Sequence, residues 1–195
     1  MRNQWPNAEF TSVDKSREFE PDICTDILEW DYKHRSTGYY QVIWASPPCE
    51  KYSRASGKNN VLEADKTARR VFEIIEYYTP VAWFVENPAT GYMHTREWIQ
   101  PYNVYLNDCT YCMYGTLYQK KTHIWSNVPV TLRCCRHGDR CPHFVTGENG
   151  KGFHPMTAQK GPSRSGGIII PGAPTKQLWR VPERLVRQLC HAANL

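Results

Sequence analysis

Short apolar runs alternate with a longer amphipathic pattern in the first half of the chain. Residues 41–45 and 81–85 are apolar runs rich in β-branched and aromatic side chains, which is typical of buried strands of a parallel sheet. Between them, apolar residues recur at helical spacing over residues 61–75, and Asn60 with Glu63 forms a capping-box pattern. This order of strand, helix and strand predicts an α/β fold.

The flanking segments carry weaker patterns. Residues 8–14 and 22–26 are predicted as short strands, and residues 101–132 alternate aromatic and polar positions as antiparallel strands or a hairpin do. Residues 161–167 are predicted as a flexible loop, and an amphipathic helix is predicted to start at Pro182. We therefore expect a core over 1–132, a small segment over 133–176, and a C-terminal part over 177–195 that returns to the core.

The first candidates for chemistry lie where the two apolar runs end. Ser46-Pro47-Pro48-Cys49 follows one run and Glu86-Asn87-Pro88 follows the other. In open α/β sheets, ligands bind at the carboxyl ends of the strands. A thiol beside a carboxylic acid is what attack at C6 of a cytosine ring requires, because the acid protonates N3 while the thiolate adds. The alternatives are a structural cysteine in a proline turn and an exposed strand-end carboxylate.

Composition and charge narrow the function classes. The chain has 195 residues and a mass of 22.7 kDa, which fits one domain with a small appendage. No apolar run could span a membrane and the start does not resemble a secretory signal, so we expect an intracellular protein. Residues 1–109 have a net charge of −4 and residues 110–195 of +9. The basic half indicates a nucleic-acid partner, with a solvated basic face as the alternative.

These motifs resemble those of the DNA (cytosine-5)-methyltransferases, most closely the short phage- or virus-type members. The resemblance rests on Pro47-Pro48-Cys49, Phe84-Val85-Glu86-Asn87-Pro88 and residues 111–125, and it runs from about residue 8 to about 190. It implies an N-terminally truncated, Rossmann-like methyltransferase sheet with a small basic Cys/His-rich insertion. It also implies S-adenosylmethionine as cofactor, double-stranded DNA as partner, and a target base flipped out of the duplex.

The resemblance also implies a role for each matching residue. Cys49 would be the nucleophile, Pro48 would shape its loop, Glu86 would contact N3, and Asn87 would order the loop. The residues expected to hold the flipped base are Gln119, Lys121 and His123, and those expected to bind the cofactor are Asp14, Asp26 and Pro47. Amino-methyltransferases carry an aromatic residue after the same proline turn, and zinc deaminases need a second cysteine at position 52, which is Tyr52.

Two departures from the family pattern carry expectations of their own. Lys121 and His123 stand where the family has arginine, so a contact to the base O2 would require a donor other than an arginine. No Gly-x-Gly turn precedes Asp14. The alternatives to an active enzyme are therefore a catalytically incomplete DNA-binding relative and a subunit whose cofactor site needs a partner chain.

The cysteines and histidines of the second half form a candidate zinc site. One grouping of Zn²⁺ ligands takes Cys134 or Cys135 together with Cys141, His143 and His154, and a second grouping joins Cys109 and Cys112 to two later cysteines. The alternative is reduced cysteines without metal. The candidate DNA contacts are Ser53, Arg133, Arg136, Arg140, Lys151, Lys160 and Arg164.

Overall fold

A four-stranded mixed sheet forms the centre of the molecule. The computed structural model describes residues 8–53, 61–136, 141–147, 150–159, 161–165 and 167–194. The sheet order is β3 (Val42–Ala45), β4 (Ala82–Pro88), β6 (Lys121–Ser126) and β5 (Leu106–Thr110). β3 and β4 are parallel, and β6 runs antiparallel to both of its neighbours. The predicted α/β class is thus confirmed, and the predicted hairpin within 101–132 is formed by β5 and β6.

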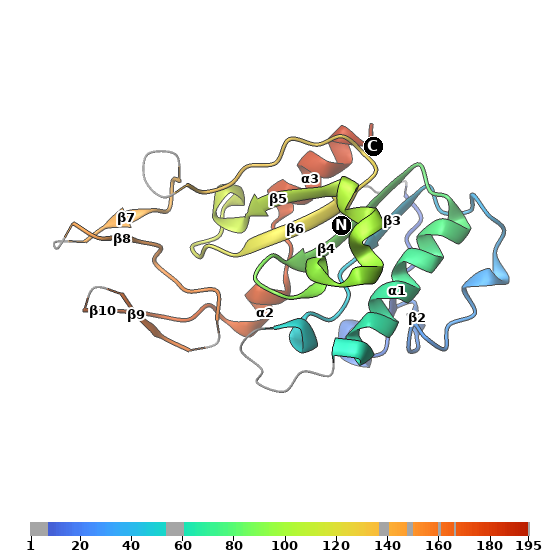
Figure 1. Ribbon diagram of the computed structural model, residues 1–195, viewed down its shortest axis with the longest axis horizontal. Helices are drawn as coiled ribbons and strands as arrows, with labels where there is room; N and C mark the ends of the chain where they lie inside the picture. Colours follow the sequence, from blue (N-terminus) through green and yellow to red (C-terminus); the bar gives the residue numbers. More distant parts are fainter. Residues whose placement is uncertain are drawn as a thin grey trace.

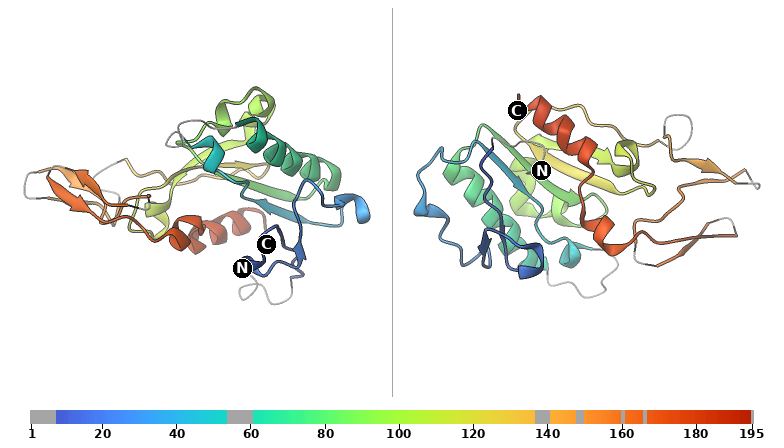
Figure 2. Two further views of the ribbon diagram at one scale, coloured as in Figure 1. Left: turned by 90° about the horizontal axis from the view of Figure 1, so that it is seen from below. Right: turned by 180° about the vertical axis from the view of Figure 1, so that it is seen from behind.

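Helices cover the two faces of this sheet (Figures 1 and 2). α1 (Val61–Tyr78) packs on one face and α3 (Glu183–Ala192) on the other. Side chains alternate along β4, so Trp83 and Val85 join the α1 core while Ala82 and Phe84 join the α3 core. This alternation places Glu86 on the α3 side of the sheet and Asn87 on the α1 side.

The two predicted helices have clear physical limits. α1 ends where Thr79 adopts a left-handed conformation with φ 45°, immediately before Pro80. Asn60, its predicted cap, lies outside the described residues. Pro182 stands at the N-cap of α3, whose Leu185 and Leu189 are fully buried. No helix among the described residues is both long and apolar enough to cross a membrane.

The N-terminal segment forms a separate parallel ladder. β1 (Val13–Asp14) pairs with β2 (Ile23–Cys24), and both strands are shorter than the predicted runs over 8–14 and 22–26. Ser12 ends the pairing on one side, because the Asp22 carboxylate accepts hydrogen bonds from both its backbone N–H and its hydroxyl. This ladder is not hydrogen-bonded to the central sheet in the part of the chain that the structure describes.

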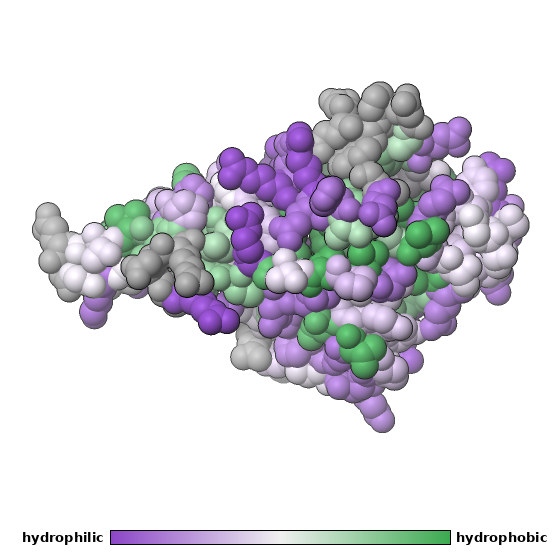
Figure 3. Space-filling view, turned by 90° about the horizontal axis from the view of Figure 1, so that it is seen from above, coloured by the Kyte–Doolittle hydropathy of each residue, from purple (hydrophilic) through white to green (hydrophobic). Residues whose placement is uncertain are grey.

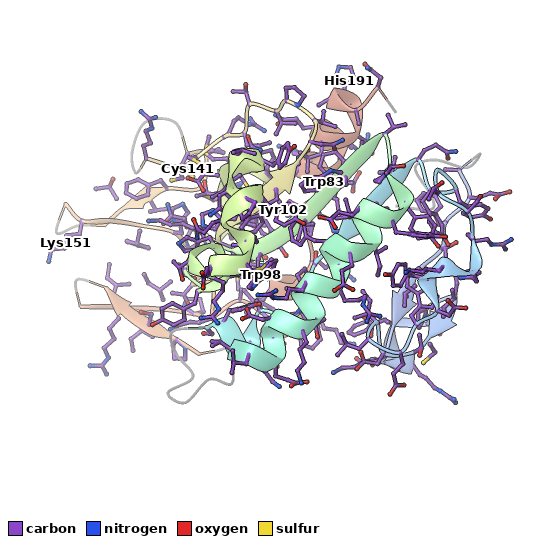
Figure 4. All side chains as sticks on the ribbon, turned by 45° about the vertical axis from the view of Figure 1, so that its right-hand side comes forward. Trp83, Trp98, Tyr102, Cys141, Lys151 and His191 are labelled. Carbon is purple, nitrogen blue, oxygen red and sulfur yellow. The ribbon has the colours of Figure 1, made fainter. Side chains whose placement is uncertain are left out.

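Short 3₁₀ helices and one short α-helix connect these elements. They are η2 (Arg17–Phe19), η3 (Tyr32–His34), η4 (Glu50–Tyr52), η5 (Met93–Thr95), η6 (Glu97–Tyr105), η7 (Tyr111–Tyr114) and α2 (Thr175–Trp179). Trp98 and Tyr102 of η6 pack on Phe72 of α1, with ring centroids 5.8 and 4.3 Å away (Figure 4).

Two hairpins project from the sheet as an extension. β7 (Val145–Thr146) pairs with β8 (Gly152–Phe153), and β9 (Ser163–Ser165) pairs with β10 (Ile168–Ile170) (Figure 1). The prediction of a flexible loop over 161–167 was wrong, because residues 163–165 form strand β9. This strand pairs with Ile168–Ile170, whose β-branched side chains favour an extended strand. The extension tapers away from the body, and hydrophobic and hydrophilic residues are mixed on the face that Figure 3 shows.

Candidate active site

Glu86 is a buried carboxylate held by two donors. Its side chain is 8% exposed, and its Oε1 accepts a hydrogen bond from the Tyr111 hydroxyl at 2.9 Å and from Lys120 Nζ at 3.2 Å. Lys120 also donates to the Leu178 carbonyl and lies 4.8 Å from the centre of the Tyr111 ring. Burial is the main reason that the pKa of Tyr111 is well above its usual value, and the Glu86 charge adds to it. Tyr111 therefore stays a hydrogen-bond donor and fixes the orientation of the carboxylate.

Cys49 lies beyond the end of β3, next to this carboxylate. β3 and β4 are in parallel register with Ala45 opposite Val85, so both motifs leave the same edge of the sheet. Cys49 is half-buried, and burial raises the pKa of its thiol. The positive charge of Lys120 lowers this pKa and the negative charge of Glu86 raises it. The thiol, the ammonium and the carboxylate thus interact electrostatically in one site.

The loop that carries Cys49 is tied to both neighbouring elements. Asn87 is fully buried, and its Nδ2 donates to the carbonyl of Pro47 at 3.0 Å. Pro47 is buried while Pro48 is exposed. Cys49 itself is the N-cap of η4, and its carbonyl accepts from the Tyr52 N–H at 3.0 Å. The position of the thiol therefore depends on β4 through Asn87 and on η4 through Tyr52.

A buried aspartate on α1 anchors η4 in turn. Asp65 is 5% exposed and accepts hydrogen bonds from the Tyr52 hydroxyl, the Trp98 indole and the Arg96 guanidinium. Burial alone would raise the pKa of Asp65, but these three donors outweigh it and lower the pKa below its usual value. Asp65 thus connects α1, η4 and the start of η6. It was not predicted from the sequence, where it looks like an ordinary polar position on an amphipathic helix.

The three residues expected to hold the flipped base lie in different environments. Gln119 is half-buried, and its Nε2 has no hydrogen-bond partner within the described chain. Lys121 is exposed at the start of β6. His123 is buried opposite Asn87, and its Nδ1 pairs with Asp108 at 2.7 Å. Burial lowers the pKa of His123, and the hydrogen bond to Asp108 opposes that shift.

The expected cofactor aspartates lie at the ends of the two strands of the N-terminal ladder, Asp14 as the last residue of β1 and Asp26 two residues after β2. Asp14 Oδ1 accepts from the Ser16 N–H at 2.7 Å, and Asp26 Oδ1 accepts from the Leu28 N–H at 2.9 Å. Both side chains are half-buried, and both turns lie at the carboxyl ends of parallel strands. Carboxylates placed there suit the hydroxyl and amine donors of a nucleoside.

A second cluster joins the extension to the sheet. The ligand atoms of Cys112, Cys135, Cys141 and His154 lie within 4.8 Å of one another, and all four residues are buried. This set differs from the predicted one. Cys134 is exposed and lies on the other side of its extended segment, 3.2 Å from the Asp108 carbonyl, and His143 is not part of the cluster. The sequence analysis assigned Cys112 to the second grouping, together with Cys109, because Cys135, Cys141 and His154 are distant from it along the chain.

The expected DNA contacts are distributed over the extension and the site. Arg133 is exposed and stacks on Tyr114 at 4.9 Å, and Arg136 is exposed next to the cysteine cluster. Arg164 is exposed on β9, and Lys151 lies at the far end of the β7–β8 hairpin, well away from Cys141 (Figure 4). Ser53 is half-buried at the end of η4. Arg140 and Lys160 lie outside the described residues.

The sequence is similar to that of a viral protein. The probable DNA (cytosine-5)-methyltransferase of frog virus 3 (isolate Goorha) is 30% identical over 188 residues. The match covers 87% of this chain and 84% of the viral protein. No family model matches the chain.

Proposed function

The chain belongs to the DNA (cytosine-5)-methyltransferase family, and from this premise we propose that it methylates C5 of cytosine in duplex DNA through Cys49. As a member of this family the protein is an enzyme that methylates cytosine in DNA. The finer parts of the proposal are the methyl donor S-adenosylmethionine, the covalent Cys49 intermediate and the roles of the individual residues. The observation that carries it is the electrostatic grouping of Cys49, Lys120 and Glu86 at one edge of the sheet.

The proposed reaction begins at the thiol. The Glu86 carboxylate takes up the proton of the Cys49 thiol, the thiolate adds to C6 of the flipped cytosine, and the Glu86 carboxyl passes that proton to N3, so that no full negative charge builds up on the ring. The electron pair of the C5–C6 double bond then becomes available at C5 as an enamine. After C5 has gained the methyl group, a base removes the remaining proton from C5, the C6–S bond breaks, Cys49 leaves as a thiolate, and the N3 proton returns to Glu86.

The residues around Cys49 and Glu86 have supporting roles. Lys120 stabilises the Cys49 thiolate, because its positive charge lowers the pKa of that thiol. Tyr111 holds Glu86 Oε1, and Asn87 holds the Pro47-Pro48 loop through the Pro47 carbonyl. Gln119, Lys121 and His123 would contact the base, and the unpartnered Gln119 Nε2 is a donor suited to a ring carbonyl.

Asp14 and Asp26 would hold the nucleoside part of S-adenosylmethionine, as their places at the ends of β1 and β2 suit its hydroxyl and amine groups. When bound, this cofactor supplies an electrophilic methyl group. Pro47 would contact the cofactor from the Cys49 loop. The basic extension over 133–176 would contact DNA phosphates and base edges, and Ser53 would lie near the DNA backbone.

Covalent trapping tests the proposal. The chain is incubated with S-adenosylmethionine and duplex DNA that contains 5-fluorocytosine, in which fluorine replaces the C5 proton and blocks the final elimination. We expect a methylated adduct on the peptide that carries Cys49, none with Cys49→Ala, and an unchanged yield with the control Cys24→Ala, whose thiol is exposed on β2. Glu86→Gln should slow adduct formation sharply. An adduct on another residue, or full activity of Cys49→Ala, would refute the nucleophile.

The edge of β3 that faces away from β4 favours a second candidate, in which the same activity requires a partner chain. Within the described chain, β3 pairs only with β4, and the β1–β2 ladder is separate. A strand from a partner chain that pairs with this edge would complete the cofactor site. Calorimetric titration of the purified chain with S-adenosylmethionine distinguishes the two arrangements. Saturable one-to-one binding would support a chain that binds the cofactor by itself. Binding only after a partner chain is added would support a subunit whose cofactor site the partner completes.

A further inference from the structure

The Cys112, Cys135, Cys141 and His154 cluster has the composition and the dimensions of a tetrahedral metal site. His154 Nε2 lies 3.3 Å from Cys141 Sγ and 3.8 Å from Cys135 Sγ. A tetrahedral zinc ion with bonds of about 2.3 Å to sulfur and about 2.0 Å to nitrogen separates its ligand atoms by roughly 3.5–3.8 Å. Four side chains from separate segments thus already converge at the spacing that one ion requires.

The surroundings of the four groups are closed and ordered. Each residue is at most 8% exposed. The backbone N–H of Cys135 donates to the Thr110 hydroxyl at 2.6 Å, which fixes the segment that carries this ligand. The Phe144 ring packs edge-on to His154 at 5.7 Å and lies directly over Gly152, where a Cβ would come within 1.9 Å of it. Glycine at position 152 therefore lets an aromatic ring cover the imidazole ligand.

We propose that Cys112, Cys135, Cys141 and His154 bind a structural Zn²⁺ ion. Three thiolates and one imidazole are the soft and borderline ligands that zinc prefers. All four coordination positions are filled by protein side chains, as in structural rather than catalytic zinc sites.

The ion would fasten the extension to the catalytic core. Cys112 belongs to η7, Cys135 to the segment leaving the sheet, Cys141 to the start of the β7–β8 hairpin, and His154 directly follows β8. The only apolar cluster described there consists of these cysteines with Met113 and Phe144. Such a small core stabilises little by burial, so a metal ion that cross-links these segments would supply the missing stabilisation.

The site also lies beside the proposed catalytic acid. Cys112 directly follows Tyr111, whose hydroxyl holds Glu86 Oε1. Fixing η7 by zinc would therefore fix Tyr111 as well as the extension. Zinc removal should accordingly weaken DNA binding and slow methylation, although the metal takes no part in the chemistry.

Metal analysis of the purified, reduced chain is the first test. We expect one equivalent of zinc per chain by elemental analysis. Replacement by Co²⁺ should give the strong visible absorption and sulfur-to-cobalt charge transfer of a tetrahedral Cys₃His site. A reduced, folded chain that contains no zinc and takes up neither Zn²⁺ nor Co²⁺ would overturn the proposal, as would a disulfide between any two of these cysteines in the protein purified without oxidant.

Variants at neighbouring cysteines test the ligand set. Cys135→Ser should reduce zinc content and Co²⁺ affinity at least tenfold, whereas Cys134→Ser, one position away and exposed, should keep the full equivalent. If Cys135→Ser fails to fold, His154→Cys still tests the site: it should retain one zinc and shift the cobalt bands toward those of a Cys₄ site. Equal zinc loss in Cys134→Ser, or unchanged cobalt bands in His154→Cys, would refute this ligand assignment. These readouts do not depend on methylation, so a failure of the zinc proposal can be distinguished from a failure of the proposed function.

Discussion

Replacing Asp65 by asparagine removes a buried charge that anchors the nucleophile loop. The asparagine side chain keeps an oxygen where Oδ1 accepts from Tyr52 at 2.9 Å and from Trp98 at 2.8 Å. Its NH₂ group takes the place of Oδ2, which accepts from Arg96 Nε at 3.0 Å and Nη2 at 2.9 Å. Two charge-assisted hydrogen bonds are then replaced by a contact between donors.

The size of the effect follows from these two bonds. A hydrogen bond to a charged group contributes about 1.5–3 kcal/mol, and the lower end applies because the Arg96 side chain is 31% exposed and regains water. We therefore expect Asp65→Asn to lower the free energy of unfolding by about 3 kcal/mol. For a domain of this length that corresponds to a fall in Tm of roughly 6–12 °C.

The pH dependence gives a second, independent signature. The folded-state pKa of Asp65 is lowered, so its contribution to stability is present in full above the ordinary carboxyl pKa of about 4 and is lost as the pH falls through the lowered value. The difference in Tm between wild type and Asp65→Asn should therefore be largest near neutral pH and shrink in acid.

Thermal unfolding followed by circular dichroism between pH 3 and 7 measures both effects. Glu63→Gln is the matched control, because it removes a carboxylate from the same helix that is 42% exposed and pairs with an exposed Lys66. It should change stability by less than about 0.5 kcal/mol. A Tm for Asp65→Asn within about 2 °C of wild type at pH 7, or a difference independent of pH, would refute the anchoring role.

Three further changes test the catalytic pair and the extension. Tyr111→Phe removes the hydroxyl that holds Glu86 and should slow single-turnover methylation about tenfold, the equivalent of about 1.4 kcal/mol, with DNA affinity unchanged in a filter-binding assay. Lys120→Met removes the charge that lowers the pKa of Cys49, so the rising limb of the kcat/KM profile should move to higher pH; an unmoved limb would exclude Lys120 from activating the thiol. Lys151→Gln should reduce the slope of log Kd against log salt by about 0.9, as expected for one lost phosphate contact, and an unchanged slope would place the hairpin tip away from DNA.

Several elements follow from the sequence because their signals are local. The helical periodicity from residue 61 onward and the uninterrupted apolar runs before Cys49 and Glu86 predicted α1, β3 and β4, since each pattern is complete within one segment. The proximity of the two motifs also followed, because strands joined through a helix run parallel and end at the same edge of the sheet.

The tertiary structure alone decided which distant residues become partners. Asp65 is one acidic residue among many on a helix, and only the packing of η4 and η6 against α1 surrounds it with three donors. Lys120 was not singled out from the sequence, because adjacent residues point to opposite sides of an extended segment and the sequence does not say which of them faces Glu86. The grouping of Cys112 with Cys135, Cys141 and His154 also depends on the tertiary structure. The spacing of cysteines along the chain can suggest pairs of ligands, but which pairs form one four-ligand site depends on how the segments fold together.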